Sequence, residues 1–168
     1  MFSGHIAQLM AEYNRWINTR LYDACERLSD TQRKEARGAF FGSLHATLEH
    51  LVWGDGVWLS RFNGKTYSTA QPGESHFPDF GKLRAERVFL DQEILDWANS
   101  VDQQWLDEPM TWTSRLYSFT QTQPRWVQVM QMFNHQTHHR GQATTLLSQF
   151  GIDYGPTDLP VLPLLNEP

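Results

Sequence analysis

The sequence predicts an all-α protein built as a four-helix bundle, with a short β excursion before the last long helix. Four long segments carry apolar residues near helical spacing, at about residues 3–28, 42–62, 82–103 and 124–150. A stretch rich in glycine, proline and serine, residues 63–80, separates the second segment from the third. Four helices with one long crossover connection are typical of a bundle.

The remaining segments connect or follow these helices. Residues 29–41 are polar and contain a glycine, which indicates a connection, and residues 104–123 alternate and use Thr, Trp, Tyr and Phe, which favours a two-stranded excursion. Pro124 suits the first turn of the last helix, and Gly151 suits its end. The tail, residues 152–168, holds four prolines and is expected to pack as an irregular strap. We therefore expect residues 1–168 to form a single domain.

Composition excludes several classes of protein. Hydrophobic residues make up 40% and charged residues 20%, as in soluble globular domains. The net charge is −5 without any basic cluster, which argues against nucleic-acid binding. The sequence contains no run of about 20 apolar residues, the length needed to span a bilayer. Its first residues lack the pattern of a secretory signal. The single cysteine, Cys25, excludes an internal disulfide and is expected to be a small buried hydrophobe, so we expect a cytoplasmic protein.

The stretch NHQTHHRGQ, residues 134–142, places three histidines within five residues. At about 100° per residue, His135 and His139 share one sector of the helix with apolar residues, whereas His138 points about 100° away. Two imidazoles on one buried face can bind the same divalent ion, although a buried histidine is more often simply hydrogen-bonded. His50, on the second helix beside Ala46 and Gly54, is the best candidate for a third ligand. His45 lies off that sector and is expected to be exposed.

Several neighbouring residues have expected roles that are not catalytic. Asp55 falls on the leucine-rich side of the second helix, which favours a structural ion pair. Arg140 faces away from the histidine sector and is expected to pair with a carboxylate at an interface, while Gly141 is expected at a helix–helix contact. Gln142, at the edge of the sector, could hydrogen-bond a ligand histidine or reach the pocket. Aromatic surroundings are expected from Trp16, Trp53 and Trp58.

Three stretches together resemble the DinB/YfiT-like family over most of the chain. They are EYNRWINTRLYDAC in the first helix, SLHATLEHLVWGDGVWLSRFNG in the second, and NHQTHHRGQ, which matches the pattern H-x-x-x-H-R-G-Q. The resemblance implies an up-down-down-up bundle that commonly forms homodimers. It also implies a three-histidine metal site, which falls here on His50, His135 and His139.

The resemblance also implies the expected function. Some relatives look like metal-dependent hydrolases, and others like transferases that join low-molecular-weight thiols to electrophiles. Three imidazoles leave a coordination position open, as in catalytic sites, and suit Zn²⁺ first and Ni²⁺ next. We therefore expect one divalent transition-metal ion per chain and a metal-dependent enzyme, with thiol S-transfer ahead of hydrolysis. The alternative is a dimeric stress-response protein that binds a metal or small molecule without turnover.

Overall fold

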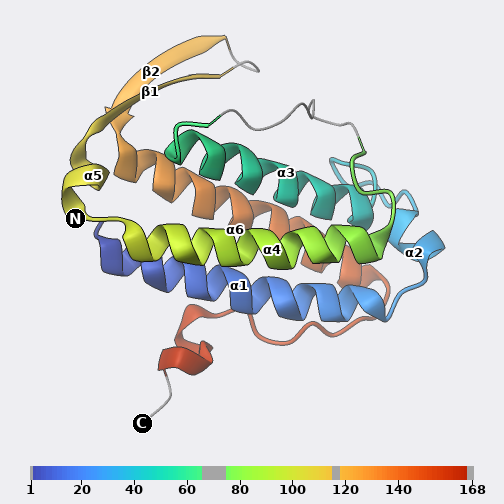
Figure 1. Ribbon diagram of the computed structural model, residues 1–168. Coiled ribbons are helices and arrows are strands. Elements are labelled where there is room, and N and C mark those ends of the chain that lie inside the picture. Colours follow the sequence, from blue (N-terminus) through green and yellow to red (C-terminus); the bar gives the residue numbers. More distant parts are fainter. Residues whose placement is uncertain (1, 66–74, 115–117, 166–168) are drawn as a thin grey trace.

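A computed structural model shows a bundle of four long helices, as predicted (Figure 1). It describes the chain except for residues 1, 66–74, 115–117 and 166–168. The long helices are α1 (Gly4–Glu26), α3 (Leu44–Phe62), α4 (Phe80–Ser100) and α6 (Arg125–Gln149). Two short helices, α2 (Asp30–Lys34) and α5 (Gln103–Asp107), lie in the segments between them.

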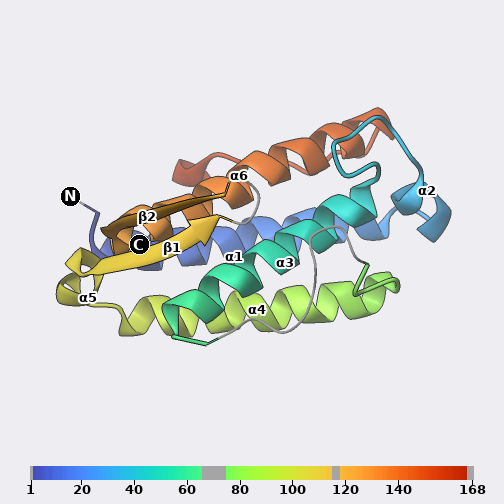
Figure 2. The same ribbon diagram turned by 90° about the horizontal axis from the view of Figure 1, so that it is seen from above.

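The helices follow the up-down-down-up order. Helices α1 and α6 run in one direction along the bundle, and α3 and α4 run in the other (Figures 1 and 2). Helix α1 packs against α4, and α3 packs against both α6 and α4. Because α3 and α4 are parallel, the connection between Phe62 and Phe80 joins opposite ends of the bundle, which is the long crossover that the sequence predicts.

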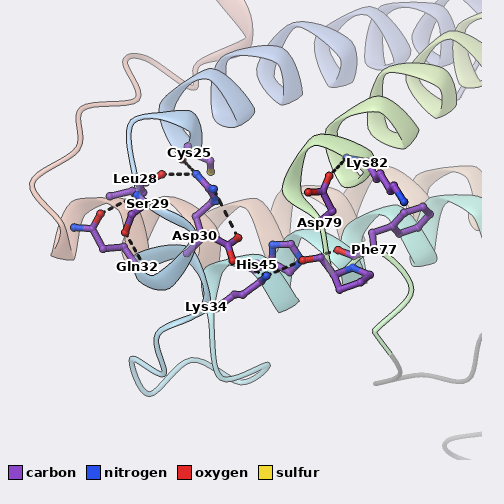
Figure 3. Close-up of polar contacts among 12 residues, drawn as sticks. Cys25, Leu28, Ser29, Asp30, Gln32, Lys34, His45, Phe77, Asp79 and Lys82 are labelled. Atoms are coloured by element: carbon purple, nitrogen blue, oxygen red, sulfur yellow. Dashed lines mark hydrogen bonds and ion pairs between the residues drawn. The ribbon is translucent and has the colours of Figure 1, made fainter.

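Short polar side chains fix where the helices begin. Ser43 Oγ accepts a hydrogen bond from the Ala46 amide at 3.2 Å. Asp79 Oδ1 accepts one from the Lys82 amide at 2.9 Å, as Figure 3 shows. Each bond satisfies an amide that the first turn leaves without a helical partner. These caps place the first turn of α3 and of α4, and therefore the faces that the two helices turn inward.

The core consists of apolar side chains from all four long helices. Its fully buried members include Leu21, Leu48, Leu83, Ile94, Val129 and Leu147. Cys25 is fully buried among them, as predicted, and burial raises the pKa of its thiol to about 12. The thiol therefore stays protonated and behaves as a small hydrophobic side chain.

The predicted β excursion is a two-stranded antiparallel sheet that rises from the α5 end of the bundle and lies above α3 and α6 in the view of Figure 1. Strand β1 (Pro109–Ser114) pairs with β2 (Phe119–Pro124). Trp112 on β1 packs against Trp58 of α3 with ring centroids 5.7 Å apart, which attaches the sheet to the helices.

The C-terminal tail lies across α1, held by side chains that donate to its backbone. The Tyr13 hydroxyl donates to the Thr157 carbonyl at 2.6 Å, and Arg20 donates to the carbonyls of Tyr154 and Pro156. Leu162 is buried against the side chain of Tyr13. Over its described residues, 152–165, the tail is irregular apart from two single 3₁₀ turns, Leu159–Val161 and Pro163–Leu165. The single-domain organisation stays a prediction.

The expected exposure of His45 is wrong. Only 3% of its surface is exposed, and its Nε2 lies 2.7 Å from the Phe77 carbonyl oxygen (Figure 3). One turn further along α3, Glu49 Oε1 accepts hydrogen bonds from the Ser75 hydroxyl and from the His76 and Phe77 amides. The segment before α4 therefore covers this side of α3. Among the described helices, none is both long and apolar enough to cross a membrane.

Candidate metal centre

His50 of α3 and His135 and His139 of α6 meet between the two helices. The Nε2 atoms of His50 and His135 lie 3.0 Å apart. The ring centroid of His139 lies 4.5 Å from that of His50 and 4.4 Å from that of His135. One nitrogen from each ring can be chosen so that all three lie within 4.8 Å of one another. The structure thus brings together the three histidines that the sequence singled out.

Space for the His135 ring comes from Gly54 on the facing helix. A Cβ atom added to Gly54 would lie 2.6 Å from Cε1 of His135 and 3.1 Å from its Nδ1. Carbon atoms do not approach so closely, so any larger residue at position 54 would displace the ring. Gly54 therefore allows α3 and α6 to approach closely enough for the three imidazoles to meet.

The three imidazoles are kept neutral by their surroundings. Burial, with a smaller contribution from the charge of neighbouring histidines, lowers the pKa of His50 to about 4 and that of His135 to about 3. Burial also lowers the pKa of His139. Metal ligation requires neutral imidazole, so the rings are in the ligating form at neutral pH.

Gln142 orients His139, which is one of the two roles expected for it. Its Oε1 lies 2.8 Å from His139 Nδ1 and can only accept, so Nδ1 carries the proton and Nε2 keeps its lone pair. The amide nitrogen of Gln142 in turn lies 3.4 Å from Nε2 of His138, an exposed ring that stands edge-on to His139. A carbonyl that holds the second nitrogen of a histidine in this way is common among metal-binding histidines.

The donor set fits a divalent transition-metal ion. A tetrahedral zinc ion with nitrogen ligands at about 2.0–2.1 Å separates those nitrogens by about 3.3 Å. The facing nitrogens of His50 and His135, at 3.0 Å, are already close to that spacing. The Nδ1 atom of His135 is buried without a hydrogen-bond partner among the described residues. Three imidazoles alone leave the coordination shell incomplete, so an ion held here would have room for a further ligand.

Aromatic rings form a wall around His50. Phe41 stacks on it with centroids 4.1 Å apart and lies 5.3 Å from His139, and Trp53 stacks at 5.6 Å. Phe40 stands edge-on to Phe41 and is 83% exposed. Phe41 was not among the predicted site residues, because it precedes α3 and belongs to no helical face. The pair of phenylalanines between Gly38 and Gly42 was the available signal.

Two tryptophans expected near the histidines pack elsewhere. Trp58 contacts Phe62 and Trp112 on the side of α3 that faces the sheet. Trp16 contacts Tyr13 and the guanidinium of Arg20, beside the C-terminal tail. The expectation that Trp16 and Trp58 surround the metal site is therefore wrong, whereas the expectation for Trp53 is correct.

Asp55 forms a structural ion pair, as expected. Its Oδ2 accepts from Arg87 Nη1 at 2.8 Å, and Arg87 Nη2 lies 2.9 Å from Asp91, with all three side chains buried. Burial disfavours the charge of Arg87, but the carboxylates of Asp91 and Asp55 outweigh it and raise the Arg87 pKa above its ordinary value. Asp55 is thus part of a buried ion pair in the core and is not a candidate for chemistry at the histidines.

Two expectations for the end of the histidine stretch are wrong. Arg140 is buried and meets side-chain amide oxygens of Asn14, Asn18 and Gln136, so it does not pair with a carboxylate at an interface. A Cβ at Gly141 would meet nothing within 4 Å, so Gly141 is not a helix–helix contact. The helical wheel gave the direction of each side chain but could not show what lies in that direction.

The chain is thus a four-helix bundle with a candidate three-histidine metal centre between two of its helices. The sequence model of the DinB family matches residues 1–167, and the chain belongs to the DinB family.

Two relatives illustrate the range of the similarity. The protein named DinB from Bacillus subtilis (strain 168) is 25% identical over 153 residues, covering 88% of this chain and 87% of that protein. The crystal structure of a DinB-like protein from Bacillus cereus ATCC 10987 superimposes with a TM-score of 0.60 at 16% identity, covering 83% of this chain and 89% of that one. The structural likeness supports the same fold.

Proposed function

We propose that the chain is a metal-dependent enzyme that binds one divalent transition-metal ion through His50, His135 and His139. The observation that carries the proposal is the convergence of three neutral imidazoles at one point between α3 and α6. Burying imidazoles whose ring nitrogens are incompletely hydrogen-bonded, as at His135 Nδ1, is costly, and a shared ion would compensate for that cost. Thiol S-transfer to an electrophile is the first candidate reaction, and hydrolysis is the second.

The residues around the histidines suit this chemistry. A divalent ion bound there would lower the pKa of a coordinated thiol or water and so supply a nucleophile at neutral pH. Gln142 would hold Nε2 of His139 toward the ion. Phe41 and Trp53, which both stack on the His50 ring, would help to exclude water from it and offer apolar surface to an electrophile.

Metal content is the first experiment. We expect one Zn²⁺ per chain in purified protein, or Ni²⁺ where nickel is supplied, because imidazole suits both ions. Elemental analysis checks the stoichiometry. His139→Ala should lose the ion, while His5→Ala, which removes an exposed histidine from the start of α1, should keep it. Equal metal content in both variants would contradict the assignment of the site.

Turnover is the second experiment. Zn²⁺-loaded protein is mixed with cysteine, glutathione or coenzyme A and with 1-chloro-2,4-dinitrobenzene. The carbon–sulfur bond forms, chloride leaves and the thiol proton passes to buffer. We expect a rate that disappears in His139→Ala and persists in His5→Ala. Hydrolysis is followed in parallel with 4-nitrophenyl acetate. Equal rates for wild type and His139→Ala in both assays would reject catalysis at this site.

The alternative is a protein that binds a metal or small molecule without turnover. It is favoured by one observation, that among the described residues no carboxylate hydrogen-bonds any of the three histidines. A saturable, metal-dependent affinity for a thiol, measured by calorimetry without product formation, would support it.

Homodimerisation is a separate part of the proposal. It rests on the family resemblance alone. Sedimentation equilibrium of the metal-loaded chain should give twice the mass of 19.6 kDa. A mass of one chain across the concentrations used would reject it.

A further inference from the structure

A cavity lies on a different side of α6 from the three histidines, between α6, α1 and the C-terminal tail. Its volume is about 250 Å³. Its wall is formed mainly by Tyr13, Ile17, Leu21, Arg140, Gly141 and Tyr154, and none of its lining residues is a histidine. The cavity is thus separate from the candidate metal centre and independent of the function proposed for it.

Arg140 is the charged group in this wall, and it lacks a carboxylate partner. Only 4% of its surface is exposed. Its Nη1 meets only neutral amide oxygens, and its Nη2 is buried without a hydrogen-bond partner among the described residues. No carboxylate of the described chain lies within ion-pair distance of it, in contrast to Arg87, which has Asp55 on one side and Asp91 on the other.

The two buried arginines differ in how well their charge is compensated. Arg87 has carboxylate oxygens at 2.8 and 2.9 Å, whereas the polar side-chain atoms around Arg140 are the oxygens of neutral amides. A buried cation without a counter-ion is costly, and a guanidinium is suited to bind a carboxylate with two parallel hydrogen bonds. A carboxylate entering the cavity would supply the missing partner.

The rest of the cavity indicates what the carboxylate would be attached to. Ile17, Leu21 and the rings of Tyr13 and Tyr154 offer apolar surface, and three threonines, Thr137, Thr144 and Thr157, add polar groups to the wall. An engineered apolar cavity of about 150 Å³ accepts benzene. A volume of about 250 Å³ therefore suits one ring or a short aliphatic chain together with its carboxylate.

We propose that this cavity binds a small monocarboxylate with an aromatic or short aliphatic body, with its carboxylate at the guanidinium of Arg140. The body lies against the apolar side chains of α1 and under the tail, beside Gly141. The rival is a purely structural Arg140, whose charge is balanced at longer range by Asp55 and Asp91, and it predicts no binding.

The test uses chelator-treated, metal-free protein, so that no carboxylate can bind an ion at the histidines. Benzoate and hexanoate are titrated into ¹⁵N-labelled protein, and benzamide serves as the uncharged analogue. We expect saturable shifts at the amides of Thr137, Gly141 and Thr144. Benzoate should bind at least about tenfold more tightly than benzamide, because a charged partner of a buried guanidinium contributes more than 1.4 kcal/mol.

A variant that fills the cavity distinguishes this site from others. Gly141→Leu places its side chain in the cavity, and because a Cβ at Gly141 meets nothing within 4 Å the variant should fold. It should weaken benzoate binding at least about tenfold, whereas His139→Ala should leave it unchanged. The proposal is overturned if neither benzoate nor hexanoate binds at concentrations up to about 10 mM, which is well above the dissociation constant of a specific site. It is equally overturned if benzamide binds as tightly as benzoate, or if Gly141→Leu binds as the wild type does.

Discussion

At the scale of single residues, Gly54 decides how closely His135 can approach α3. A methyl group there would lie 2.6 Å from Cε1 of His135, so Gly54→Ala must push the ring away from His50. We expect Zn²⁺ affinity to fall at least about tenfold, since a displaced imidazole loses its place in a three-ligand site. Competition with a chromophoric chelator measures the change.

Gly141→Ala is the matched control, because it makes the same substitution within a helix. A Cβ at Gly141 meets nothing within 4 Å, so no ring moves. It should leave Zn²⁺ affinity unchanged and raise the free energy of unfolding by about 0.5–1 kcal/mol, the usual gain of alanine over glycine within a helix. If Gly54→Ala bound zinc as tightly as Gly141→Ala, the steric argument would be wrong.

Single-residue prediction from the sequence succeeded where the residue lies on a regular helix. The wheel placed His135 and His139 together and Gln142 at their edge, and the structure agrees. Phe41 could not be found in this way. Its position depends on a turn in which Gly38 and Gly42 have φ of 73° and 81°, which brings a non-helical residue over His50.

At the scale of elements, Glu49 is expected to hold the segment before α4. Its Oε1 accepts from the Ser75 hydroxyl at 2.9 Å and from the amides of His76 and Phe77 at 3.1 and 2.8 Å. Glu49→Ala removes this acceptor, so the two amides should exchange with solvent at least about tenfold faster, the equivalent of one lost hydrogen bond. Hydrogen exchange followed by NMR measures both amides.

Glu49→Gln provides the control for charge. Its carboxamide oxygen can still accept in the place of Oε1, so exchange at His76 and Phe77 should stay within a few-fold of wild type. Fast exchange in both variants would show that the negative charge matters rather than the acceptor. Unchanged exchange in Glu49→Ala would show that the segment is held by other contacts, such as that of His45 with Phe77.

The long helices could be predicted from periodicity, because apolar residues on one face must be buried. The prediction that His45 is exposed was wrong for a related reason. Periodicity describes one helix at a time, and the segment that covers His45 comes from the distant end of the crossover. The short helix α2 was hidden in a polar connection, although Ser29 and Gln32 form a capping box that the sequence itself contains.

At the scale of the whole molecule, the buried histidines should make the metal-free protein sensitive to acid. In the unfolded chain a histidine has a pKa of about 6.5, whereas His50 and His135 have pKa values of about 4 and about 3 when folded. Between these values the unfolded state binds more protons, so the free energy of unfolding should fall as the pH falls below about 6.5.

The size of this effect can be measured against a variant. His135 should contribute up to about 2 kcal/mol of lost stability between pH 7 and pH 5, reduced by its partial exposure to solvent. Urea denaturation of metal-free wild type and His135→Asn at both pH values measures it. The variant should lose less stability than wild type over this range, and an equal loss would show that His135 is not buried as a neutral ring.

Three of the four long helices are also joined by one buried polar network, which extends beyond the pair expected for Asp55. Asp55 of α3 pairs with Arg87 of α4, Arg87 pairs with Asp91, and Asp91 accepts hydrogen bonds from Asn14 and Asn18 of α1. The sequence could indicate a structural role for Asp55 from its place among leucines. It could not indicate Arg87, because that partner lies 32 positions away on a helix whose rotation depends on packing.

Asp55→Asn tests how much this network contributes to the fold. The variant keeps the shape of the side chain but leaves Arg87 with one carboxylate in a buried setting, and breaking such a pair costs about 3–5 kcal/mol. We expect a loss of about 3 kcal/mol in the free energy of unfolding, measured by urea denaturation at pH 7. Asp23→Asn is the matched control, since Asp23 pairs with Arg84 at 2.5 Å on the exposed surface and should cost less than about 1 kcal/mol. Equal losses in the two variants would mean that Asp55 and Arg87 stabilise the bundle no more than an exposed ion pair does, and that packing alone holds α3 against α4.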